Sequence, residues 1–174
     1  MDWRIPCAGV AFAASGIVFG HEPGPHVHGV ARLQIAVDGP VLTMFLDSPV
    51  ANLLGFEHYP KSESQKAAVR ALGDRLRKAE DIFALTPAAK CSVTSVRLES
   101  PVLGPGPAAG ASNAGHADLE AEYAFRCGIP AELREVEVNL FAGFPNMRQI
   151  DVQVAGSKGQ AGATLTASRR RVSF

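Results

Sequence analysis

Hydrophobic and polar residues alternate along several stretches of this chain, with the period of two that is typical of strands burying one face. The alternation over residues 27–37 predicts a first strand. Asp38-Gly39 is a tight-turn signal, and the apolar residues 41–46 follow it directly. We therefore predict a β-hairpin, which Pro49 ends.

The same alternation returns in the second half of the chain. Residues 119–127 form a clean amphipathic pattern, and residues 91–99 predict a strand whose phase shifts between Ser92 and Leu98, as a β-bulge would cause. Further alternating apolar positions are Val136, Val138, Leu140, Ala142, Phe144, Ile150, Val152 and Val154. After a predicted turn at 156–159, two more short strands should reach Phe174.

One segment has helical periodicity instead. Ser62 and Gln65 have the spacing of a capping box, so a helix is predicted over residues 62–79. Its apolar stripe and its polar face are Ala68, Val69, Leu72, Leu76 and Ala79 against Arg70, Asp74, Arg77 and Lys78. The predicted fold class is α+β: a largely antiparallel β-sheet with one main amphipathic helix, in a single domain.

The first twenty residues differ from the rest. Arg4 and the free amine precede a run of apolar or small residues at 5–19, and polar residues begin at His21. This layout predicts a signal peptide over residues 1–20, because the run is too short to span a bilayer. An uncleaved anchor and a mis-assigned start are the alternatives. Cleavage would leave one exported, periplasmic domain at 21–174, not attached to a membrane, with a flexible Gly/Ala/Pro-rich loop at 101–117.

Loss of the leader would remove Cys7 and leave Cys91 and Cys127. An even number of cysteines in an exported chain suggests a disulfide, with two buried free thiols as the alternative. Neither cysteine has a CxxC partner or a nearby histidine, which argues against thiol catalysis and against a cysteine-based zinc site.

Charge and motifs exclude several function classes. The chain has 17 basic and 17 acidic residues, so no electrostatic footprint indicates nucleic-acid binding. It contains no GxSxG, no HExxH and no phosphate-cradling glycine loop. We therefore predict a protein that is not an enzyme.

The richest chemistry lies at the start of the predicted mature chain. His26 and His28 are two residues apart, so an extended backbone would point both imidazoles to one face, near the surface. Two imidazoles can bind zinc, but zinc normally takes three or four protein ligands. Candidates for the remaining ligands are His58, Glu57, His116 and His21.

Two other interpretations of these histidines remain open. If cleavage leaves His21 first, its amine and ring could chelate a metal alone, and copper would then compete well. The histidines could also be solvated or hydrogen-bonded without any metal. His58 follows the aromatic Phe56 closely, a setting in which a single histidine usually packs or caps a turn.

Several stretches, taken together and in order, resemble the ZrgA family of periplasmic zinc-uptake-associated proteins. The most distinctive is Gly55-Phe56-Glu57-His58. The others are His26-Val27-His28-Gly29, Asn52-Leu53-Leu54, Gln65, Cys91, Gly115-His116-Ala117-Asp118, Cys127, Leu140-Phe141, Phe144-Pro145, Asp151-Val152-Gln153-Val154 and Gly159-Gln160.

The resemblance implies a non-catalytic protein that binds or buffers zinc for an uptake system, with that system's transporter or binding protein as a partner. It makes His26 and His28 motif histidines and places His58 in the Gly-Phe-Glu-His motif. Family members carry a long His-, Asp- and Glu-rich insertion, whereas residues 104–115 here contain none of these residues. The expectation is therefore a single zinc site. Alternatives are an envelope interaction module without metal and a copper-handling protein.

Overall fold

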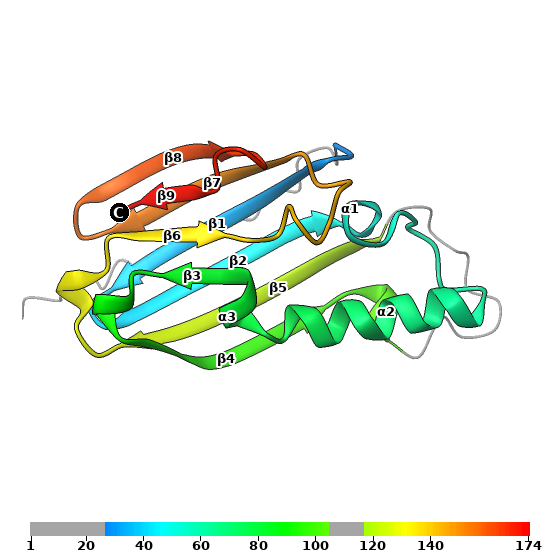
Figure 1. Ribbon diagram of the computed structural model, residues 1–174, viewed down its shortest axis with the longest axis horizontal. Coiled ribbons are helices and arrows are strands. Elements are labelled where there is room, and N and C mark those ends of the chain that lie inside the picture. Colours follow the sequence, from blue (N-terminus) through cyan, green and yellow to red (C-terminus); the bar gives the residue numbers. More distant parts are fainter. Residues whose placement is uncertain (1–26, 105–116) are drawn as a thin grey trace, which may run out of the picture.

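The computed structural model describes residues 27–104 and 117–174 of the chain (Figure 1). Nine strands lie within these residues: β1 Val30–Asp38, β2 Val41–Pro49, β3 Phe83–Leu85, β4 Cys91–Glu99, β5 Asp118–Cys127, β6 Glu135–Val138, β7 Gln149–Gly156, β8 Gly159–Leu165 and β9 Arg171–Ser173. The α-helices are α1 Val50–Leu54, α2 Glu63–Leu76 and α3 Ala79–Ile82. Short 3₁₀ turns are η1 Pro87–Ala89, η2 Pro101–Leu103 and η3 Pro130–Glu132. The predicted α+β class with one main helix is confirmed.

The strands form two sheets. The larger has the order β4-β5-β2-β1-β7-β8 and the smaller the order β3-β6-β9. Every pairing between these strands is antiparallel except that of β1 with β7, which is parallel and lies inside the large sheet. The β1–β2 hairpin turns at Gly39-Pro40, as the Asp38-Gly39 signal predicts, and Gly39 has the positive φ of such a turn.

Within the described residues, a second layer covers one face of the large sheet and leaves the other face open. In Figure 1, α2 and the small sheet lie over the same face of the large sheet. Leu33, Leu46 and Tyr123 of the large sheet are fully buried there, together with Phe83 and Val136 of the small sheet. The alternating apolar residues of β1, β2 and β5 therefore build one core, because their side chains all point to the covered face.

Helix α2 begins as its sequence predicts. The Ser62 hydroxyl accepts from the Gln65 N–H, and the Gln65 side chain accepts from the Ser62 N–H. The helix ends at Leu76, however, and Ala79 begins the separate helix α3. Ala68 is exposed, so the buried stripe is Val69, Leu72, Gly73 and Leu76.

Strands β4 and β5 pair as an antiparallel hairpin, and the predicted disulfide is confirmed. Cys91 and Cys127 stand directly opposite each other and are bonded. The predicted bulge lies between Val93 and Ser95. The disulfide closes the open end of this hairpin, while the segment after Glu99 joins its other end.

The alternation over 136–144 was not a single strand. Strand β6 ends at Val138, and the following residues form turns that bury Leu140, Phe141 and Phe144 but expose Ala142. The buried apolar residues of these turns therefore recur with a spacing similar to the period of two that is typical of a strand. Among the helices of the described residues, none is both long and apolar enough to cross a bilayer.

Candidate metal centre

His28 lies in a turn just before β1, not on the predicted strand 27–37. The strand begins at Val30, and Gly29 has a φ of +88°, which favours glycine. This reversal breaks the period-two alternation, so His28 shares no strand face with Arg32 and Gln34. The surface position is nevertheless correct, because 64% of the His28 side chain is exposed.

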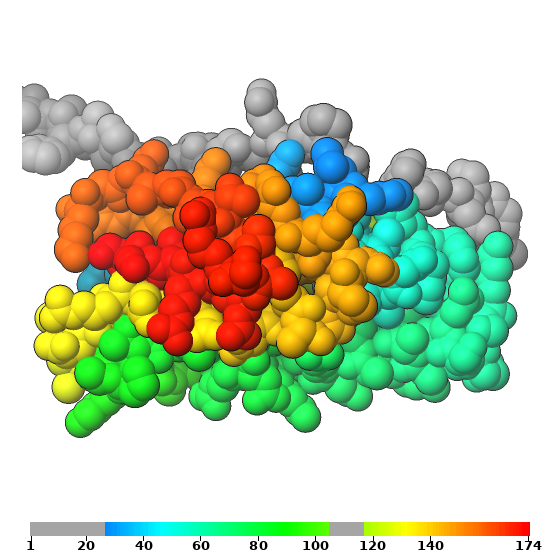
Figure 2. Space-filling view, turned by 45° about the horizontal axis from the view of Figure 1, so that its top comes forward, coloured from blue at the N-terminus to red at the C-terminus, as the bar shows by residue number. Residues whose placement is uncertain are grey.

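Three chain segments meet at this turn. The Gly29 carbonyl accepts from the N–H groups of Arg148 and Gln149, at 2.8 and 2.9 Å, and the Arg148 guanidinium donates to the His28 carbonyl at 3.0 Å. Figure 2 shows the segment before β7 beside the blue start of β1 and the cyan region of α1. The turn that carries His28 is therefore fixed to the core of the protein through its backbone.

Glu57 faces His28 from the loop after α1. Gly55, with a φ of +79°, ends this short helix, and its N–H donates to the Ala51 carbonyl. The Oε1 atom of Glu57 lies 2.9 Å from Nε2 of His28, and the Glu57 side chain is only 12% exposed. A largely buried carboxylate thus orients an exposed imidazole, the partnership that commonly accompanies histidine metal ligands.

His58 is half-buried and has different partners. Its Nδ1 atom lies 2.8 Å from the Tyr59 carbonyl oxygen, so Nδ1 carries the proton and Nε2 keeps the lone pair. Its ring stacks on Phe56 with a centroid distance of 5.1 Å. The packing of this histidine against an aromatic neighbour agrees with the alternative drawn from the sequence.

The structure brings together only part of the predicted ligand set. Within residues 27–104 and 117–174, no three His, Cys, Asp or Glu side chains gather closely enough to hold an ion, so His58 does not complete the His28–Glu57 pair. His21, His26 and His116 lie outside the described residues, as does the predicted signal peptide. Cys91 and Cys127 form the disulfide and are not available as ligands.

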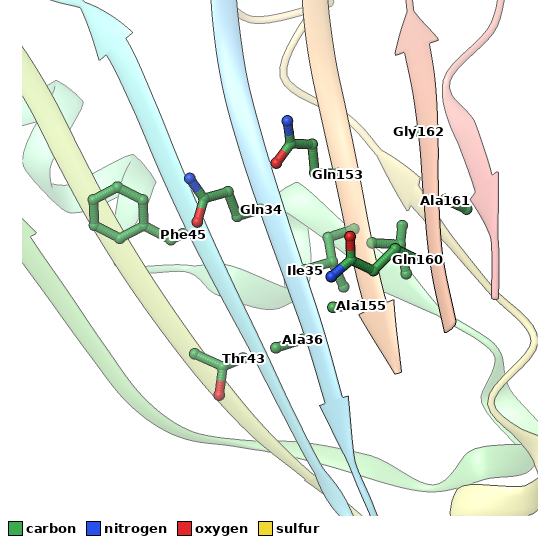
Figure 3. Close-up of a pocket in the computed structure, with 11 residues that line it drawn as sticks. Gln34, Ile35, Ala36, Thr43, Phe45, Gln153, Ala155, Gln160, Ala161 and Gly162 are labelled. Carbon is green, nitrogen blue, oxygen red and sulfur yellow. The ribbon is translucent and has the colours of Figure 1, made fainter. Parts of the chain in front are cut away.

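A hollow among the described residues lies elsewhere, on the open face of the large sheet (Figure 3). It has a volume of about 610 Å³, and the side chains of Gln34, Gln153 and Gln160 border it together with Phe45. None of its 11 lining residues is His, Cys, Asp or Glu. This depression therefore offers none of the side chains that zinc or copper prefers.

Comparison with known proteins identifies the family. A search of curated proteins finds no match to this chain. A family model described as "ZrgA family zinc uptake protein" matches residues 25–174, which include the His28 turn, the Glu57 loop and both cysteines. The match covers far more than half of the sequence, and the chain therefore belongs to the ZrgA family of zinc uptake proteins.

Proposed function

We propose that this protein binds a single zinc ion in the periplasm and thereby assists zinc acquisition or buffering. The observation that carries the proposal is the contact between the exposed His28 imidazole and the largely buried Glu57 carboxylate. Membership of a zinc uptake family supports the choice of metal. The family is one of uptake proteins, and we assign no catalytic residue.

His28 would bind zinc through one defined nitrogen. Because Nε2 faces Glu57, the Nε2–H group donates a hydrogen bond to that carboxylate, and the lone pair available to a metal is the one on Nδ1. A carboxylate in this position fixes the orientation of the imidazole. His26, two residues earlier in the chain, would supply a second imidazole. His116 and His21 remain candidates for the other ligands. His58 would join them only if it left its contacts with Phe56 and Tyr59.

A competitive zinc titration tests the proposal. The protein, with its N-terminus established by mass spectrometry, is titrated against a chromophoric chelator beside the double variant His26→Ala/His28→Ala. We expect about one zinc per chain, lost in the double variant. Binding in the wild type no tighter than in the double variant would refute the site and direct attention to an envelope interaction role. Copper binding that requires His21 at the N-terminus would favour copper handling instead.

Glu57→Gln distinguishes a supporting carboxylate from a direct ligand. Glutamine loses the negative charge but its oxygen can still accept from Nε2, so we expect the affinity for zinc to fall by no more than about 10–100-fold, the usual effect of losing a supporting partner. A fall as complete as that of the double histidine variant would make Glu57 a direct ligand. Affinity should also fall below about pH 6, because protons compete with zinc for the imidazoles.

The proposed cellular role follows from the leader and the disulfide. The predicted signal peptide would deliver residues 21–174 to the periplasm, and the Cys91–Cys127 bond is compatible with that oxidising compartment. A zinc-uptake transporter or its binding protein would then receive the metal. Transfer of zinc from the loaded protein to the apo binding protein of the same cell, faster than release into buffer, would support this partnership.

A further inference from the structure

Asn52 is a buried polar residue of helix α1 whose side-chain hydrogen bonds go to residues outside that helix. Only 2% of the residue is exposed. Its Oδ1 atom accepts from the Gly29 N–H at 2.6 Å, and its Nδ2 group donates to the Val30 carbonyl at 2.9 Å and to the Ser48 hydroxyl at 3.2 Å. Since one partner must donate and another must accept, the network also fixes which way the amide points.

These bonds hold the residues that directly follow His28. Gly29 and Val30 are fixed by the Asn52 amide from one side, while the Gly29 carbonyl is fixed by the N–H groups at the start of β7. The same helix leads into the loop that carries Glu57, five residues after Asn52. The Asn52 side chain therefore connects the turn that carries His28 to the helix and loop that carry Glu57, the two segments whose side chains contact each other in the His28–Glu57 pair.

We propose that Asn52 is a positioning residue of the metal site, which fixes the His28 turn against Glu57 before any metal arrives. This inference rests on the proposed zinc function. Its consequence is a site of which one half is preformed, so that zinc need not order the His28 backbone as it binds. Preorganisation of this kind increases affinity because less ordering accompanies binding.

Two substitutions separate positioning from general stability. Asn52→Ala removes both backbone contacts of the turn, and we expect about tenfold weaker zinc binding, the lower end of what lost supporting contacts cause. Ser48→Ala is the matched control. It removes the 3.2 Å bond from Asn52 Nδ2 to the Ser48 hydroxyl and the 3.2 Å bond from that hydroxyl to the Pro49 carbonyl. The loss leaves one Asn52 N–H without its partner and lowers stability, but the bonds of Asn52 to Gly29 and Val30 remain. Zinc affinity should be unchanged in that variant.

Hydrogen exchange provides a readout that does not depend on zinc. The Gly29 amide is buried and bonded to Asn52, so in the metal-free wild type it should exchange slowly, as followed by NMR. Exchange should accelerate in Asn52→Ala and stay slow in Ser48→Ala. The order parameter of the His28 amide should fall in Asn52→Ala alone.

Weaker zinc binding and faster Gly29 exchange in Asn52→Ala alone would establish the positioning role. Equal zinc affinities in the two variants, or Gly29 exchange insensitive to Asn52, would overturn it. If the wild type itself fails to bind zinc, the proposed function falls. The exchange rate of the Gly29 amide and the order parameter of the His28 amide would then show, without zinc, whether Asn52 fixes the turn. If both values were unchanged in Asn52→Ala, the positioning role of Asn52 would be refuted as well.

Discussion

Tyr123 carries a hydroxyl that the core does not satisfy. The residue lies at the centre of β5, is 0% exposed, and packs edge-on against Phe83 with a centroid distance of 4.9 Å. Its hydroxyl has no hydrogen-bond partner among the described residues. A buried polar group without a partner costs about 1–3 kcal/mol of folding free energy. Tyr123→Phe removes this cost and keeps the ring, so the variant should be more stable than the wild type.

The expected gain in stability is the cost of the unpaired hydroxyl minus the packing contacts that its oxygen makes. Part of the 1–3 kcal/mol is offset because the small void left by the oxygen loses packing contacts, so we expect a net gain of about 1 kcal/mol. For a chain of this length that corresponds to a rise in melting temperature of about 2–4 °C. Urea unfolding followed by circular dichroism measures the free energy directly.

The pH dependence of the stability difference between Tyr123→Phe and the wild type gives a second test. Burial raises the pKa of Tyr123 well above its ordinary value. The stability associated with a raised pKa is fully present below the unfolded-state value of about 10 and is lost as the pH rises towards the folded-state value. The gap between Tyr123→Phe and wild type should therefore be constant below pH 10 and widen above it, by about 1.4 kcal/mol per pH unit.

Tyr59→Phe provides the control, because the chain has only two tyrosines. In that variant Tyr123 is the sole source of phenolate absorbance, which should appear only as alkaline unfolding proceeds. A Tyr123→Phe variant less stable than the wild type at neutral pH would contradict the predicted cost of the buried hydroxyl. A stability difference that stays constant above pH 10 would contradict the raised pKa of Tyr123.

Two further predictions concern the disulfide and the N-terminal cap of helix α2. Replacing both cysteines by serine, Cys91→Ser/Cys127→Ser, should cost about 3.8 kcal/mol, the chain-entropy value for a separation of 36 residues. Urea unfolding measures this cost, and an effect below 1 kcal/mol would contradict the entropic account. Ser62→Ala should lower stability by about 1 kcal/mol, whereas Ser62→Gly should cost only a few tenths. Thermal melts compare both variants with the wild type, and no loss of stability in Ser62→Ala would mean that the capping bond to Gln65 does not stabilise α2.

Local periodicity made much of the fold predictable. Residues of β1, β2 and β5 alternate because each strand has one face on the core, and that relation needs no knowledge of distant contacts. The cap of α2 and the β4–β5 bulge are likewise local. The parallel pairing of β1 with β7 was not predicted, because it joins segments more than 100 residues apart and leaves no mark in either sequence.

The site was predictable only in part. The sequence suggested His28, from the His26/His28 pair, and Glu57, from the Gly-Phe-Glu-His stretch, as candidates, but their contact depends on how the Gly29 turn and α1 meet. Strand parity failed at His28 because a single positive φ at Gly29 redirects the chain. Asn52 gave no chemical signal of its own, since an asparagine near a helix start usually indicates a cap and here it bonds to another segment.

The position of β1 also has a consequence for biosynthesis. Its two neighbours in the large sheet are β2, which follows at once, and β7, which emerges from the ribosome more than 100 residues later. Until residues 149–156 are available, the β1–β2–β5–β4 half-sheet has β1 as an unpaired edge, a template for pairing with other chains. Nascent or truncated chains that end before residue 149 should therefore aggregate or need a chaperone, whereas the finished chain covers that edge with its own β7.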